Sequence, residues 1–66
     1  MRIVVNGTAR DVRPGITLAE LLGELAVDPR RVAVAVNAAV IPRGEWAGRT
    51  LTDLERIEII EAVGGG

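Results

Sequence analysis

The sequence predicts an α+β fold in which one main helix packs across a mixed sheet of four to five strands. Three observations lead to it: an Asn-Gly pair between two short β-prone runs, one stretch with a leucine stripe, and valine- and isoleucine-rich runs with strand periodicity. Sixty-six residues suffice for one small domain, which buries only roughly 60% of its unfolded surface. We expect residues 1–63 to form a single domain, followed by a flexible glycine tail over residues 64–66.

The first element is a predicted β-hairpin. Asn6-Gly7 separates residues 1–5 from residues 8–13, and both turn residues tolerate the positive φ of a type I′ turn. Val12 is the only large apolar residue of the second arm, which is typical of an exposed edge strand. Pro14-Gly15 ends this arm.

A helix is predicted to begin after Thr17. Thr17 and Glu20 have the spacing of a capping box, in which each side chain binds the other residue's backbone N–H. Asp28-Pro29 is expected to end the helix, because Pro cannot donate to the preceding turn. The apolar stripe consists of Leu18, Leu21, Leu22 and Leu25, with Glu20 and Glu24 on the solvent side.

The second half of the chain reads as strands around an irregular segment. Residues 32–36 alternate valine and alanine, so both faces are apolar and we expect a central strand whose valine side is covered by the helix. Residues 40–41 suggest a brief strand, residues 43–47 one helical turn around a Trp46 at the edge of the core, and residues 56–63 a last strand. This order and the chain length match the β-grasp.

Composition excludes several kinds of function. The formal net charge of −1 lacks the basic surface typical of proteins that bind nucleic acid or anionic membranes. Without Cys, His or Lys the chain offers no zinc ligands and no activated nucleophile, so we assign no catalytic residue and no metal site and do not expect an enzyme. The longest mostly apolar run is about half the ~20 residues of a membrane span, and no leader pattern is visible; we therefore expect a cytoplasmic protein.

The most informative segment is the tail formed by Gly64, Gly65 and Gly66. Glycine has no Cβ, so a narrow enzyme channel can close around its backbone. Fully extended, three residues reach about 10 Å. Because ordering them opposes binding by roughly 3–6 kcal/mol, the folded face of the protein must supply most of the affinity for a partner.

Segments along nearly the whole chain resemble one family. They are Asn6-Gly7, residues 17–22, residues 32–37, residues 40–43 with Glu45-Trp46, residues 56–59 and residues 62–66. With them the chain resembles the ThiS family of sulfur carriers in thiamine biosynthesis, ubiquitin-like β-grasp proteins that end in Gly-Gly. Asp53-Leu54-Glu55 departs from the Asp-Gly-Asp that is common in the family, and a leucine at positive φ would be strained.

The resemblance implies a mechanism in which the chain is acted upon. A ubiquitin-activating-type adenylyltransferase would use ATP to convert the Gly66 carboxylate to an acyl-adenylate. A persulfide donor would then yield the thiocarboxylate, and a thiazole synthase would take its sulfur. The carrier itself would bind no cofactor and would provide the substrate group rather than catalysis.

Partners of such a carrier would bind the folded surface near the tail. Ile60 and Val63 are the apolar candidates for this contact, although Ile60 is equally suited to packing within the sheet. Arg56, Glu58 and Glu61 are the candidates for a charged rim.

Two alternative functions remain open. The first is another thiocarboxylate sulfur carrier, such as the small subunit of molybdopterin synthase, whose members tend to be longer. The second is a non-catalytic β-grasp interaction module, in which Gly66 could be blocked or extended without loss of function.

Overall fold

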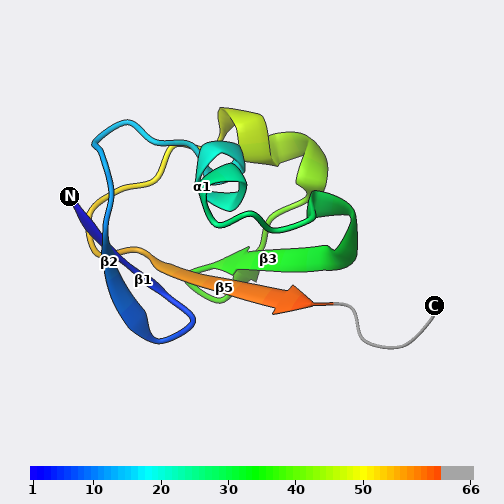
Figure 1. The fold of residues 1–66 in the computed structure, drawn as a ribbon, viewed down its shortest axis with the longest axis horizontal. Coiled ribbons are helices and arrows are strands. Elements are labelled where there is room, and N and C mark those ends of the chain that lie inside the picture. Colours follow the sequence, from blue (N-terminus) through cyan, green and yellow to red (C-terminus); the bar gives the residue numbers. More distant parts are fainter. Residues whose placement is uncertain (62–66) are drawn as a thin grey trace.

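The computed structural model of the chain describes residues 1–61. They form a five-stranded mixed sheet with one α-helix and two 3₁₀ helices (Figure 1). This confirms the predicted α+β architecture, while the proposed division between residues 63 and 64 lies outside the described residues. The elements are β1 (Arg2–Val5), β2 (Thr8–Asp11), α1 (Leu18–Glu24), η1 (Pro29–Arg31), β3 (Val32–Val36), β4 (Ala39–Val40), η2 (Arg43–Gly48) and β5 (Arg56–Glu61).

The sheet is organised around its last strand. The strand order is β2-β1-β5-β3-β4, with β5 parallel to β1 and antiparallel to β3. The prediction that residues 32–36 form the central strand is therefore wrong: in the strand order, β3 lies next to the central strand, which is β5. β3 does lie inside the sheet with Val34 and Val36 buried, but β5 inserts between the two hairpins and takes the centre.

Both hairpin turns use residues with positive φ. Asn6 and Gly7 have φ values of 48° and 82°, which confirms the predicted first hairpin, and β2 is fully exposed at the edge as expected. Asn37 and Ala38, at 50° and 70°, form the turn between β3 and β4. This turn places β4 at Ala39–Val40, one residue earlier than predicted.

The core lies between the sheet and α1. Trp46, within the 3₁₀ helix η2 where the helical turn was expected, is 4% exposed, and its indole N–H donates to the Ile41 carbonyl oxygen at 2.8 Å. Its predicted place in the core is thus confirmed. The buried cluster comprises Ile3, Ile16, Leu18, Leu21, Leu22, Val34, Val36, Trp46, Leu51 and Ile57.

Helix α1 is shorter than the sequence predicted. It ends at Glu24 rather than at Asp28-Pro29. The N–H of Val27 donates to the carbonyl oxygen of Leu22 at 3.2 Å and that of Ala26 to Gly23 at 3.1 Å, the bonding pattern of a Schellman motif. Ala26 takes the left-handed conformation at φ 57°, so the position that usually carries glycine gave no helix-stop signal.

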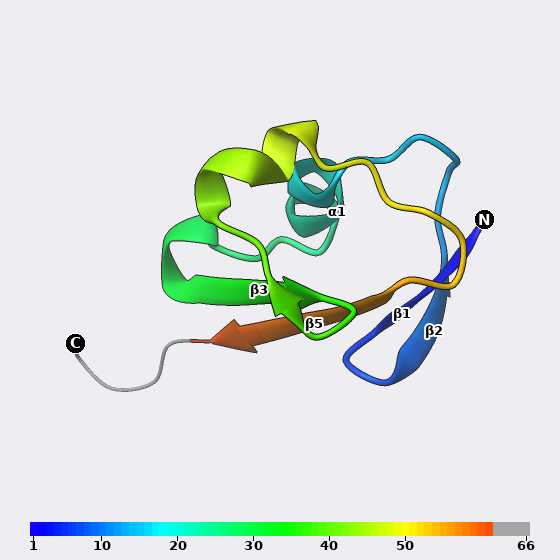
Figure 2. The same cartoon turned by 180° about the vertical axis from the view of Figure 1, so that it is seen from behind.

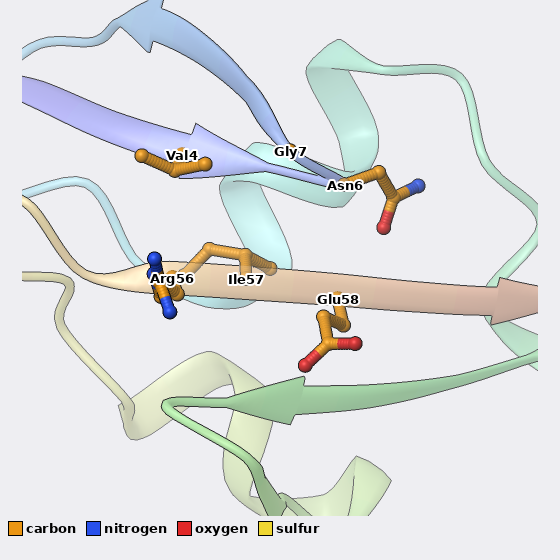
Figure 3. A pocket seen from close by; sticks show the side chains of 6 residues that line it. All are labelled: Val4, Asn6, Gly7, Arg56, Ile57 and Glu58. Carbon is orange, nitrogen blue, oxygen red and sulfur yellow. The ribbon is translucent and has the colours of Figure 1, made fainter.

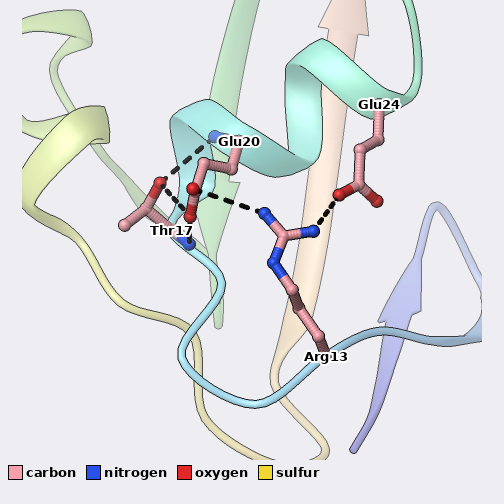
Figure 4. Close-up of polar contacts among 4 residues, drawn as sticks. All are labelled: Arg13, Thr17, Glu20 and Glu24. Atoms are coloured by element: carbon pink, nitrogen blue, oxygen red, sulfur yellow. Dashed lines mark hydrogen bonds and ion pairs between the residues drawn. The ribbon is translucent and has the colours of Figure 1, made fainter.

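The start of α1 has the predicted capping box (Figure 4). Thr17 Oγ1 accepts the Glu20 N–H at 3.2 Å, and Glu20 Oε1 accepts the Thr17 N–H at 2.9 Å. Hydrogen bonds from the Thr17 backbone and then its side chain hold the pKa of Glu20 below its ordinary value. Arg13 lies between Glu20, at 3.3 Å, and Glu24, an ion-pair network that the sequence analysis did not anticipate.

The loop before β5 contains a leucine in a strained conformation. Leu54 has φ 66° and is 65% exposed, a geometry that the sequence had left open. Its N–H donates to the Arg2 carbonyl oxygen at 2.6 Å, and Asp53 Oδ1 accepts the Arg2 N–H at 3.1 Å. The loop therefore binds the start of β1 with its backbone, whereas the Leu54 side chain projects into solvent.

The same loop contains a buried carboxylate. Glu55 is 7% exposed; it accepts a hydrogen bond from Arg49 at 2.6 Å and another from the Thr52 N–H at 2.8 Å. Burial acts to raise the pKa of Glu55, but these hydrogen bonds outweigh it and the pKa is lowered.

We predict that Thr17→Ala lowers the free energy of unfolding by about 1 kcal/mol, because it removes the side-chain acceptor of the N-cap. Denaturant melts measure this. Arg13→Ala is the control and should have a smaller effect than Thr17→Ala, since its ion pairs are exposed. An unchanged midpoint for Thr17→Ala would contradict the assigned cap.

We predict that Leu54→Gly leaves stability unchanged or raises it by up to about 1 kcal/mol. Relief of the left-handed strain, roughly 1–2 kcal/mol, exceeds or balances the unfolded-state entropy that glycine adds. Leu54→Ala removes the same exposed side chain and keeps the strain, so it should show no gain. A clear drop in melting temperature for Leu54→Gly alone would show that the leucine side chain stabilises the loop.

We predict that Glu55→Gln lowers the free energy of unfolding by about 1–2 kcal/mol at pH 7, because it weakens a charge-assisted hydrogen bond. The folded-state pKa of Glu55 is depressed. Its contribution is therefore complete above the unfolded-state value of about 4.3 and is lost as pH falls through the folded pKa. Melts from pH 7 to pH 2 should show the gap between wild type and variant closing in acid; a gap that does not depend on pH would refute this role.

Candidate functional site

One face of the sheet has no helix packed on it. Within residues 1–61, α1, η1 and η2 all lie on the same side of the sheet (Figures 1 and 2). Side chains alternate along a strand, so Ile57 points into the core while Arg56, Glu58 and Ile60 of β5 point to the uncovered side. Ile60 is 58% exposed.

Neighbouring strands add apolar side chains to this surface. Ala33 pairs with Ile60, Ala35 pairs with Glu58, and Val40 of β4 pairs with Ala35, so all of these side chains share the uncovered face. Val40 is 71% exposed. We call Ala33, Val40 and Ile60 the bare-face patch; Ala35 lies on the same face but is only 7% exposed.

A concavity of about 600 Å³ lies beside the patch, between the ends of β1 and β5 (Figure 3). In Figure 3, Val4 projects from β1, while Arg56 and Glu58 project from β5. The concavity thus has an apolar wall and two opposite charges, which suits contact with a polar protein surface. It is lined by Val4, Asn6, Gly7, Arg56, Ile57 and Glu58.

Two asparagines hold β5 in place from both sides. Asn6 donates its N–H to the Ile57 carbonyl oxygen at 2.9 Å, and its Oδ1 accepts the Ile59 N–H at 2.8 Å. On the other side, Asn37 donates its N–H to the Arg56 carbonyl oxygen at 2.8 Å, and its Oδ1 accepts the Arg56 N–H at 3.0 Å. The strand that leads to residues 62–66 is therefore fixed in both position and direction.

The structure brings together three of the residues that the sequence proposed for a partner face. Arg56, Glu58 and Ile60 share the uncovered face. Glu61 does not join them: it projects to the opposite side of β5 and lines a separate hollow with Asp28 and Arg31. Val63 and the tail residues Gly64, Gly65 and Gly66 lie outside the described residues.

The sequence pattern did not indicate the contributions of Ala33, Val40 and the two asparagines. The alternation of Val and Ala predicted a strand with two apolar faces, of which the helix would cover the valine side, and it did not show that Ala33 is exposed. Asn at each of the two hairpin turns was the available signal for the asparagines, but a pattern of turns does not show which backbone group a side chain reaches.

Metal-ligand clusters and membrane-spanning helices are both absent from the described part of the chain. Residues 1–61 contain no cluster of three acidic, His or Cys side chains able to hold a metal ion. Their helices also include none with the length and apolar character needed to cross a membrane.

Comparison with known proteins adds the family context. Residues 3–66 match the family model of the ThiS family. The chain is 32% identical to the sulfur carrier protein ThiS of Escherichia coli K12 over the full length of both, and 39% identical over all 66 residues to a thiazole synthase of Paramagnetospirillum magneticum, of which it spans 20%. A crystal structure of the thiamine biosynthesis protein ThiS from Geobacter metallireducens superposes on the chain with a TM-score of 0.88. The two sequences are 30% identical, and the match covers the full length of both chains.

Proposed function

The chain belongs to the ThiS family, and we propose that it is a sulfur carrier of thiamine biosynthesis that holds sulfur as a thiocarboxylate on Gly66. One observation supports a carboxylate rather than a thiol as the group that carries sulfur: the sequence has no cysteine. A persulfide on the chain is therefore ruled out as the means of carrying sulfur. An activated carboxylate is the alternative, and Gly66 supplies it without a side chain that would shield its carbonyl carbon.

The chemistry begins with activation of the carboxylate. A carboxylate oxygen of Gly66 attacks the α-phosphate of ATP and releases pyrophosphate, which gives an acyl-adenylate with AMP as a good leaving group. The terminal sulfur of a persulfide donor then attacks the acyl carbon and displaces AMP. A thiol that cleaves the remaining S–S bond leaves the thiocarboxylate.

We assign these steps to enzymes that act on the chain. A ubiquitin-activating-type adenylyltransferase would form the adenylate, and a thiazole synthase would accept the sulfur. The partnership with a synthase is supported by the thiazole synthases of P. magneticum and Magnetococcus marinus, which are 39% and 38% identical to the chain over a fifth of their own length. These relatives unite a region similar to the chain with synthase sequence in one protein.

The folded surface would provide the affinity for both enzymes. Fixing each backbone residue of the tail costs about 1–2 kcal/mol, so binding energy must come from elsewhere. The bare-face patch and the concavity with Arg56 and Glu58 lie along β5, the strand that runs to the tail. An enzyme that covers this face would hold β5 and receive the tail in one fixed direction.

We predict that deleting Gly66, or adding one alanine after it, lowers pyrophosphate exchange by the adenylyltransferase at least about 10²-fold. Either change moves the carboxylate by roughly 3.5 Å, and a misplacement of about 1 Å already has an effect near 10²-fold. The melting temperature should not change, because neither change alters a residue of the described buried cluster.

Arg10→Ala is the matched control. Arg10 lies on the exposed edge strand β2, away from β5, and the variant should exchange pyrophosphate at the wild-type rate. Wild-type rates in both tail variants would refute the carrier proposal and favour an interaction module.

A further inference from the structure

β5 pairs with its two neighbouring strands over different lengths. β3 pairs with it from Ile57 to Glu61, whereas β1 pairs with it only at Arg56 and Ile57. Beyond this point the first hairpin turns away, and no other described strand lies alongside the second half of β5 on that side (Figure 1).

The direction of each backbone group on β5 follows from the asparagine bonds. The N–H and carbonyl of Arg56 both bond to Asn37, so they point toward β3. Successive residues alternate, and the groups of Ile57, Ile59 and Glu61 therefore point toward the β1 side. The bonds of Asn6 to the Ile57 carbonyl and the Ile59 N–H agree with this alternation.

Asn6 supplies the last hydrogen bonds on that side. Its Oδ1 takes the place that a further residue of β1 would occupy in the ladder. Among the described residues, no partner follows for the Ile59 carbonyl or for the N–H of Glu61. These two groups are spaced as the acceptor and donor of one rung of a β-ladder, on an edge to which an extended segment can add.

We propose that the enzyme receiving the tail adds a β-strand to this edge of β5, pairing first with the Ile59 carbonyl and the Glu61 N–H. This inference rests on the proposed carrier function. In the sequence, β5 is followed by Gly64, Gly65 and Gly66, which present only backbone donors and acceptors for recognition.

Charge favours an enzyme strand over a second copy of the chain. Residues 57–61 carry Glu58 and Glu61 and no cation. Two copies paired along this edge would place their Glu58 side chains on one face of the shared sheet and their Glu61 side chains on the other, and like charges on neighbouring strands are destabilising. The partner strand is therefore expected to carry Arg or Lys.

The variant that tests the proposal is Glu61→Pro, with Glu61→Ala as its control. Proline removes the N–H at the open edge and places its ring there, while the β3–β5 ladder loses nothing because Glu61 does not donate to β3. Alanine keeps the N–H and removes the charge. Binding to the adenylyltransferase should weaken at least about tenfold for Glu61→Pro and less than about threefold for Glu61→Ala, with both melting temperatures near wild type.

Hydrogen exchange at the Glu61 amide of the wild-type chain tests strand addition independently. It does not depend on whether the proline variant folds. This amide should exchange quickly in the free chain and slowly in the complex. Equal exchange in the free and bound chain, or equal binding by the two variants, would overturn the proposal. Protection that rises with carrier concentration without enzyme would also overturn it, in favour of self-pairing.

Pyrophosphate exchange with the wild-type chain distinguishes failure of the carrier function from failure of the strand-addition proposal. If exchange occurs and the Glu61 amide is not protected, the carrier function stands and the strand-addition proposal fails. If exchange does not occur, the carrier function itself fails.

Discussion

The insertion of β5 between the two hairpins is the constraint on which the rest of the molecule depends. Asn6 and Asn37 occupy the left-handed positions of the two turns, and each also bonds the backbone of β5. The turns thus close their own hairpins and fix the register of the central strand. β5 is the last described element, so the two asparagines fix the strand that directly precedes the tail in sequence.

Because the helices lie on one side of the sheet, one face of the sheet forms the core and the other face is available for contact with a partner. The leucines of α1 and Trp46 bury the inner face of β3 and β5, so the outer face is free of any packing requirement from residues 1–61. Small alanines there keep the surface flat, and Ile60 and Val40 remain exposed. The sequence has no reactive side chain of the Cys, His or Lys type. In the proposed function, the chain presents the Gly66 carboxylate and a surface for its partners.

Local patterns in the sequence predicted the local elements well. The Asn-Gly turn, the capping box at Thr17 and the burial of Trp46 all follow from short-range rules. The end of α1 was missed because Ala26 stands where a glycine is expected. The position of β5 was missed because strand order depends on contacts between distant segments, which periodicity does not record.

The candidate site was only partly visible in the sequence. The residues of β5 were identified because a strong strand runs directly into the glycines, and three of them do share the uncovered face. Glu61 was grouped with them by proximity in sequence, yet alternation puts it on the other side. The alternation in β3 indicated two apolar faces, but small apolar residues such as Ala33 do not reveal whether anything packs against them.

The most direct test of the carrier account is the intact mass of the protein isolated from its native cell. A fraction of the native protein should be heavier by the mass difference between a sulfur and an oxygen atom, and fragmentation should place this change on Gly66. A native protein that is never sulfur-loaded while thiamine is being made, or a sulfur that maps to another residue, would contradict it.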